Sequence, residues 1–167
     1  MPVRVRPALP EDAAQLGKMG AALVRFHHGL DPQRFMLPGG DLEAGYAGYL
    51  TREGGKKNAV VLVAEAEDGA VVGYAYGRLE GRDWSALREP CGVLDDLWVE
   101  EGHRKLGAAR ALCQEMKRHF AAKGAPRVVL MTGVANTRAQ RLFEKLGFRQ
   151  TMIELTCELP PGDASRD

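Results

Sequence analysis

VLDDLWVEEGHRKLGAARALCQEM, residues 93–116, joins a strand pattern to a helix pattern. Over residues 93–99 successive side chains fall into two alternating sets, which predicts a β-strand with neighbouring side chains on opposite faces. One set is Val93, Asp95, Leu97 and Val99, and the other is Leu94, Asp96 and Trp98. After a turn at residues 100–103, apolar residues recur at three- and four-residue steps and predict a helix with one apolar face. These residues are Leu106, Ala109, Leu112, Cys113, Met116 and Phe120.

The junction between the two patterns has the composition of a phosphate-binding helix start. Backbone N–H groups at a helix N-terminus have no helical partner, and the aligned peptide dipoles make that end positive. Arg104 and Lys105 add two cations, and the small residues at 107–109 let a phosphate approach closely. The spacing excludes a nucleoside-triphosphate loop and a dinucleotide fingerprint. The segment predicts a pyrophosphate site, with a plain solvated helix start as the alternative.

The pattern Arg-x-x-Gly-x-Ala at residues 104–109 resembles the acyl-CoA-binding motif of the GCN5-related N-acetyltransferase (GNAT) family. A second block, NTRAQRLFEKLGF at residues 136–148, is also similar to that family. The resemblance implies acetyl-CoA as the acyl donor, with its pantetheine arm in a gap where the sheet splays open after the central strand. The implied donor-site residues are Leu97, Trp98, Val99, Arg104, Lys105, Leu106, Gly107, Ala108, Ala109, Arg110, Asn136, Ala139 and Phe143. For Asn136 a helix N-cap is an alternative or additional role.

The chain length and composition fit one ordinary globular domain. The 167 residues are 45% apolar, and we predict a single domain over residues 1–160 with a frayed tail at residues 161–167. The net charge of +1 gives no sign of nucleic-acid or membrane binding, and no apolar run is long enough to span a bilayer. Three cysteines without metal-ligand spacing predict reduced thiols, no metal site and a cytoplasmic protein.

Periodicity and turn residues predict the remaining elements. Strands are predicted at residues 3–7, 59–65, 70–80, 127–131 and 148–158, and helices at 10–28, 41–52 and 139–146. With the central strand and helix, the order is β-α-α-β-β-β-α-β-α-β. This order predicts an α/β fold with a mixed sheet. It matches the GNAT fold, which implies six to seven strands flanked by about four helices.

Transfer of an acetyl group to an amine requires that the ammonium lose a proton, so a basic side chain is expected. By the resemblance, Asp95 on the central strand is the first candidate for this base, and Glu80 is the second. A purely structural role for Asp95 is the alternative. Asp96 is expected to face the opposite side of the strand and not to form a pair with Asp95. The resemblance also makes the backbone N–H of Leu97 the donor to the oxyanion.

One position departs from the family pattern. Phe143 stands where many members carry a tyrosine that protonates the departing thiolate, and phenylalanine cannot donate a proton. Because a thiolate leaves readily, water, the substrate ammonium, Tyr74 or Tyr76 are the alternatives. The first helix, the following loop and the second helix cover the acceptor site in the family. The acceptor-site candidates are His28, Arg34, Phe35, Tyr46 and Trp84.

Together these features predict an acetyl-CoA-dependent N-acetyltransferase. The acetyl group would pass directly to a primary amine of a small molecule, peptide or protein in a ternary complex, and the protein would be a homodimer. The competing hypothesis, which Phe143 favours, is an acetyl-CoA-binding sensor with little or no turnover.

Overall fold

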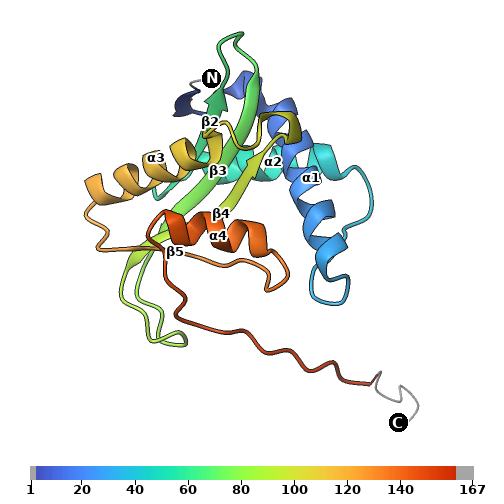
Figure 1. The fold of residues 1–167 in the computed structure, drawn as a ribbon, viewed down its shortest axis with the longest axis vertical. Coiled ribbons are helices and arrows are strands. Elements are labelled where there is room, and N and C mark those ends of the chain that lie inside the picture. The colour runs from blue at the N-terminus through green and yellow to red at the C-terminus, as the bar shows by residue number, and fades with distance from the viewer. Residues whose placement is uncertain (1–2, 161–167) are drawn as a thin grey trace.

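In the computed structural model, which describes residues 3–160, a five-stranded mixed sheet separates two layers of helices (Figure 1). The strand order is β1 (Arg4–Pro7), β2 (Ala59–Glu65), β3 (Val71–Glu80), β4 (Cys91–Val99) and β5 (Val128–Leu130). The first three pairings are antiparallel, and β4 pairs with β5 in parallel. The tail predicted to fray at residues 161–167 lies outside the described residues.

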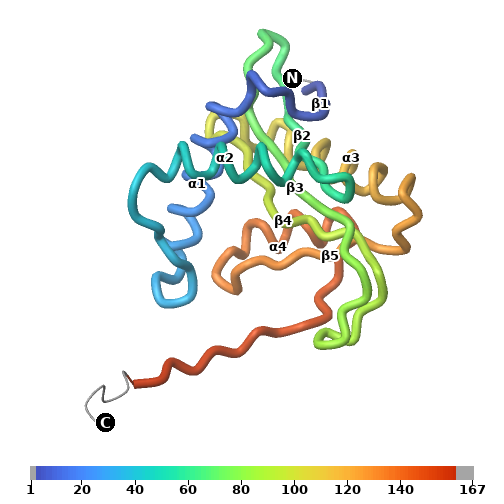
Figure 2. Tube along the Cα trace, turned by 180° about the vertical axis from the view of Figure 1, so that it is seen from behind, coloured from blue at the N-terminus to red at the C-terminus, as the bar shows by residue number. Residues whose placement is uncertain are grey.

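Four α-helices and two short 3₁₀ turns complete the described part. The helices are α1 (Ala13–Leu30), α2 (Leu42–Gly54), α3 (Ala108–Ala122) and α4 (Thr137–Lys145), and the turns are η1 (Pro10–Asp12) and η2 (Glu101–His103). Helices α3 and α4 cross in front of the sheet in Figure 1, whereas α2 crosses in front in the reverse view of Figure 2. None of the helices in residues 3–160 combines the length and apolar character needed to cross a membrane.

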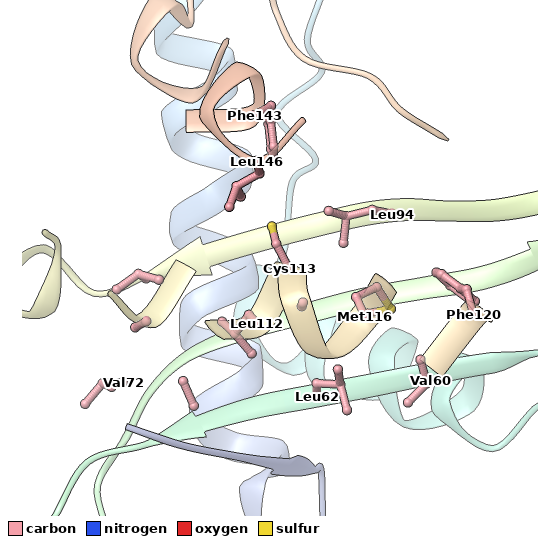
Figure 3. Packing of buried hydrophobic residues seen from close by; sticks show 14 residues of the cluster. Val60, Leu62, Val72, Leu94, Leu112, Cys113, Met116, Phe120, Phe143 and Leu146 are labelled. Atoms are coloured by element: carbon pink, nitrogen blue, oxygen red, sulfur yellow. The ribbon is translucent and has the colours of Figure 1, made fainter. Parts of the chain in front are cut away.

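Alternation along β2 divides its side chains between two cores. Val60 and Leu62 pack with α3, where Leu112, Cys113, Met116 and Phe120 form the apolar stripe predicted from the sequence (Figure 3). Val61 and Val63 pack on the opposite face with residues of α1 and α2. This two-sided burial explains why residues 59–64 form a continuous apolar run.

Close packing of α1 on α2 depends on two glycines in α1. A Cβ atom at Gly17 would lie 2.4 Å from the carbonyl oxygen of Glu43, and one at Gly20 would lie 1.9 Å from the ring of Tyr46. Both distances are far below van der Waals contact, so only glycine lets the two helices approach this closely. The Tyr46 ring therefore lies directly against the backbone of α1.

The predicted fold class is confirmed, with five strands in place of six to seven. The predicted strand at residues 148–158 is wrong for the described chain: these residues form no strand, and residues 149–160 are all exposed. Figures 1 and 2 show this segment running away from the body of the molecule after α4. The alternating pattern alone does not make a strand, because a strand also needs a hydrogen-bonding neighbour, which the described chain does not supply.

Candidate functional site

A β-bulge in the central strand brings two carboxylates to the same side of the sheet. Tyr76 of β3 pairs with Asp96, but the next residue, Gly77, pairs with Leu94, so Asp95 is an extra residue in β4. Asp95 lies beside residues of α2, and Asp96 accepts a hydrogen bond from α2. The prediction that these two aspartates face opposite sides is therefore wrong, because a bulge interrupts the two-residue alternation.

Beyond the bulge, one edge of β4 has no neighbouring strand among the described residues. β5 pairs with β4 only at positions 92–94. The N–H of Glu100 donates to the carbonyl of Val72 in β3 at 2.9 Å, so by alternation the N–H groups of Leu97 and Val99 point away from β3. The sheet thus opens where the sequence resemblance implied a gap, and the Leu97 N–H lies on the open edge.

The start of α3 lies just after this open edge and carries no side-chain cap. The N-cap residue is Gly107, at φ +92°, and Ala111 donates the first helical hydrogen bond, to the Gly107 carbonyl at 2.9 Å. The N–H groups of residues 108–110 therefore precede the helical ladder. This end of α3 has the positive, uncapped backbone that suits a phosphate.

Arg104 lies at the end of the open edge, beside Val99. Its Nε donates to the Val99 carbonyl at 2.9 Å, and its guanidinium lies 4.8 Å from the centre of the Trp98 ring. Arg104 is thus packed against β4, between the open edge and the start of α3. Lys105, at φ +69°, and Leu106 are exposed in the turn that follows.

The two predicted bases differ in how firmly they are held. Asp95 accepts from Arg78 through both oxygens, at 3.0 and 3.3 Å. Burial raises the pKa of Asp95, and the Arg78 hydrogen bond opposes that shift. Glu80 accepts from both Arg78, at 2.8 Å, and Arg88. Each carboxylate thus accepts one hydrogen bond at each oxygen, but Glu80 lies between two arginines whereas Asp95 is bound by one.

Asp95 lines a polar cavity of about 380 Å³. Its lining residues are Tyr49, Glu53, Lys56, Asn58, Ala59, Tyr76, Arg78 and Asp95. Of these, the sequence predicted Asp95 as the base and Tyr76 as an alternative acid. The other residues carry no local motif, since the fold brings them together from α2, β2 and β3.

Asp96 forms a buried polar cluster with two tyrosines. Tyr46 donates to its Oδ2 at 2.6 Å and Tyr74 donates to the same atom at 3.1 Å. Burial raises the pKa of Asp96, and it also raises the pKa of both phenols. A phenol with a raised pKa keeps its proton, so Tyr74 is poorly suited to protonate a thiolate. Tyr76 donates to Glu53 at 3.0 Å, and burial raises its pKa as well.

In α4, two predicted donor-site residues already have structural partners. Asn136 caps α4, its side chain accepting from the Ala139 N–H at 3.2 Å. Phe143 is buried in the core cluster that also contains the apolar stripe of α3, and its ring meets Phe148 edge-on at 5.7 Å. The capping role considered for Asn136 is confirmed, while a role beside acetyl-CoA stays a prediction for both residues and for Ala139.

Four of the five predicted acceptor-site residues lie along α1, α2 and their connection. The Phe35 ring lies 5.1 Å from the His27 ring, and its carbonyl lies 2.7 Å from Nδ1 of His28. Arg34 forms an ion pair with Glu154 of the C-terminal segment. Tyr46 instead points to Asp96. Trp84 is separate: it is 75% exposed in the β3–β4 connection, which lies across the molecule from the end of α1 in both views (Figures 1 and 2).

Comparison with known proteins agrees with this geometry. A model of the acetyltransferase (GNAT) family matches residues 30–148. Human N-acetyltransferase 8 is 35% identical over 109 residues, which cover 65% of this chain and 45% of that protein. The chain spans less than two thirds of the length of the curated relatives it matches.

Solved structures share the fold at low sequence identity. A tetramutant of the BH1408 protein from Bacillus halodurans has a TM-score of 0.80 at 19% identity, over 95% of this chain and 99% of that one. AAC(6')-Iy, in complex with the bisubstrate analogue CoA-S-monomethyl-acetylneamine, has a TM-score of 0.70 at 17% identity, over 96% and 100%. Since the family model spans more than half of the chain, the protein belongs to the GNAT acetyltransferase family.

Proposed function

We propose that the protein transfers an acetyl group from acetyl-CoA to a primary amine. The observation that carries this proposal is the open edge of β4, with the Leu97 N–H on it and the uncapped start of α3 beside it. A backbone N–H without a strand partner can bind a polar group of a ligand, and a helix start can bind its phosphates.

For the acyl donor, the residues at this edge fit acetyl-CoA in type and order. Leu97, Trp98 and Val99 would lie along the pantetheine arm, and the segment from Arg104 to Arg110 would hold the pyrophosphate. The bound CoA analogue in the fold relative AAC(6')-Iy supports the choice of donor. Asn136, Ala139 and Phe143 are proposed as further donor contacts. Within residues 3–160, no three His, Cys, Asp or Glu side chains lie together as a metal ion would need.

The residues of this chain have two proposed chemical roles: they remove a proton from the amine, and they stabilise negative charge on the carbonyl oxygen. Asp95 accepts a proton from the amine, since its raised pKa makes it a better base than an exposed aspartate. Glu80 is the second candidate and is held by two arginines. The Leu97 N–H stabilises negative charge on the carbonyl oxygen.

Direct transfer without a covalent acyl-enzyme is the proposed route. Burial raises the pKa of Cys113 to about 12 and raises that of Cys91 too, so neither thiol is ionised at neutral pH. The thiol form is a poor nucleophile. The third cysteine, Cys157, lies in the exposed C-terminal segment and not beside the open edge.

The amine acceptor is proposed to enter at the cavity that Asp95 lines. Glu53 and Asp95 give this cavity two carboxylates, which pair with the lining cations Lys56 and Arg78. Tyr49 and Tyr76 add two rings, and the face of an aromatic ring suits a cationic amine. His28, Arg34, Phe35, Tyr46 and Trp84 remain candidates for outer contacts. A cytoplasmic location, suggested by the unpaired cysteines, and a homodimer also belong to this proposal.

A sensor that binds acetyl-CoA without turnover is the second candidate. The observation in its favour is that Phe143 is buried in the core and carries no acid, while Tyr74 and Tyr76 donate to carboxylates. Both candidates predict binding, so only catalysis separates them.

The test is release of free thiol from acetyl-CoA by the purified protein, across polyamines, amino acids, aminoglycosides and peptide N-termini at pH 7 and pH 9. Release that depends on the acceptor supports the transferase and identifies the amine class. Binding of acetyl-CoA by calorimetry with no release from any amine favours the sensor. Failure to bind acetyl-CoA would refute both.

A further inference from the structure

The cavity that Asp95 lines carries charges of both signs. Its cations are Lys56 and Arg78. Its carboxylates are Glu53 and Asp95, so the lining has no net charge when all four side chains are ionised. A lining without net charge gives no electrostatic preference for a polyamine, which carries positive charge only. The class of acceptor therefore depends on which hydrogen-bonding groups of the lining remain free.

Glu53 is already paired and is a poor site for a second ammonium group. Nζ of Lys56 donates to both carboxylate oxygens of Glu53, at 2.7 Å each, and the Tyr76 hydroxyl donates to Oε2 at 3.0 Å. The Lys56 hydrogen bond also lowers the pKa of Glu53, so this carboxylate stays ionised beside its lysine. Asp95 therefore remains the carboxylate that can receive the reacting amine.

The two cations of the lining still have unused N–H groups within the part of the chain that the structure describes. An ammonium has three N–H donors and a guanidinium has five. Lys56 has two contacts with Glu53, which leaves at least one N–H, and its side chain is 55% exposed. Arg78 donates three hydrogen bonds, two to Asp95 and one to Glu80, which leaves two N–H groups. Free donors on cations favour a ligand group that is an anion and accepts hydrogen bonds.

A carboxylate on the acceptor would use these donors. The Arg78 guanidinium already contacts Asp95, so a carboxylate bound to Arg78 lies close to an amine bound to Asp95. In an α-amino acid the amine and the carboxylate are on the same carbon, which matches this proximity. A polyamine or an aminoglycoside has no carboxylate, and a peptide has converted the one beside its N-terminal amine into an amide.

We propose that the acceptor is a free α-amino acid whose carboxylate binds Lys56 and Arg78 while its amine lies at Asp95. This inference rests on the proposed function, which places the reacting amine at Asp95. In the transfer, the ammonium gives one proton to Asp95, and the nitrogen forms a bond to the acetyl carbon as the C–S bond breaks. A second proton passes from the nitrogen to the departing thiolate, which leaves an N-acetyl amino acid and free CoA thiol.

The first test compares α-amino acids with their carboxamides as acceptors, with thiol release as the assay. The ratio of kcat/KM for the acid to kcat/KM for its amide is measured in wild type and in Lys56→Gln. The two acceptors differ in amine basicity, but that difference is the same for both proteins and cancels when the ratios are compared. The ratio should fall about tenfold in Lys56→Gln, because the variant lacks a charged donor for the carboxylate.

Two further variants separate the possible causes of that fall. Lys57→Gln makes the same charge change at an exposed neighbour that does not line the cavity, and it should keep the wild-type ratio. Glu53→Gln with Lys56→Gln removes the whole ion pair, and its ratio should fall as in the single variant. A wild-type ratio in this double variant would overturn the inference, because the single variant would then act only by exposing the charge of Glu53.

A second measurement does not depend on turnover. The amino acid should raise the Tm of wild type and of Lys57→Gln, measured with and without CoA, because a ligand that binds the folded state stabilises it. The rise should be absent in Lys56→Gln and smaller for the carboxamide.

The outcomes distinguish this inference from the proposed function. Acetylation of amines with the same ratio in wild type and Lys56→Gln would overturn the inference and leave the proposed function standing. A wild-type preference for polyamines would also overturn it and would make Glu53 the group that binds a second ammonium. Absence of acetylation with every amine would refute the proposed function. In that case a Tm rise that Lys56→Gln abolishes would support the amino-acid site, and no rise in wild type would overturn it.

Discussion

At the scale of single residues, Asp95 and Asp96 are neighbours in the chain with different surroundings. Asp95 meets an arginine and borders a cavity, whereas Asp96 is buried and meets two phenols. The pKa of both is raised by burial, but only Asp95 lies where an acceptor amine could reach it. Exposure to the cavity therefore makes Asp95 the better candidate for the base.

Asp95→Asn should lower turnover by about 10²-fold, because a positioned base contributes that order of rate. The ionised form of Asp95 is the active one, and its raised pKa means that activity falls as the pH drops through that value. The variant should lose this acidic limb of the pH profile. Thiol release measured from pH 4 to pH 9 checks the prediction.

Glu80→Gln is the matched control, since it removes the other carboxylate that binds Arg78. If Asp95 is the base, this control keeps most of the turnover and the acidic limb. If both variants lost turnover equally, the loss would instead come from disturbing Arg78, or Glu80 would be the base.

Arg104→Glu should weaken acetyl-CoA binding at least about tenfold, because it places a negative charge between the open edge and the start of α3. It also removes the hydrogen bond to the Val99 carbonyl. Calorimetry gives the affinity, and thermal unfolding shows whether the fold is kept. Lys18→Glu, the same charge change on the exposed face of α1, should bind normally. Unchanged affinity in a folded Arg104 variant would exclude this donor site.

At the scale of elements, the contact between α1 and α2 sets the position of the Asp96 cluster. The Tyr46 ring is packed on Gly20 while its hydroxyl reaches Asp96, so a shift of one helix changes both contacts.

Gly20→Ala should destabilise the protein by about 1–3 kcal/mol, because the new Cβ overlaps the Tyr46 ring. Gly45→Ala in α2, where an added Cβ meets nothing within 4 Å, should instead stabilise it by about 0.5–1 kcal/mol. Urea unfolding of the two variants measures both changes. If Gly20→Ala left the free energy of unfolding unchanged, that result would contradict the close packing of α1 on α2.

Most elements could be predicted from local sequence, and the exceptions have physical causes. The strand at residues 59–65 and the helix that follows the central strand agree with β2 and α3 because side-chain periodicity reports burial directly. The bulge at Asp95 was missed because it depends on the register between two strands. The strand predicted at residues 148–158 is wrong because strand pairing needs a neighbour, which a local pattern cannot supply.

At the scale of the whole molecule, a partly buried ion pair links folding stability to pH. Arg6 donates to Asp12 at 2.7 Å and to Glu65 at 2.7 Å, joining the N-terminal strand and η1 to β2. The hydrogen bond from Arg6 lowers the pKa of Asp12 below its ordinary value of 3.8. A lowered folded-state pKa contributes stability above the ordinary value, and that stability is lost as the pH falls through the folded-state pKa.

Asp12→Asn should therefore cost about 2 kcal/mol of unfolding free energy at pH 7, and the difference from wild type should shrink towards pH 2. Chemical denaturation at several pH values measures this. Glu67→Gln, the same charge change at an exposed residue, should show almost no loss at either pH. A loss for Asp12→Asn that does not vary with pH would show that the ionised pair is not its source.

Local sequence determined the order of elements, the two apolar faces around the central strand and the family motif at residues 104–109, because each depends on residues within a few turns of chain. Only the tertiary structure decided which carboxylate is buried, which edge of β4 is open and that residues 149–158 lack a strand partner in their own chain. Tyr46 and Asp96, for example, are hydrogen-bonded across 50 positions of sequence. Such contacts arise from the packing of helices on the sheet, which no local pattern records.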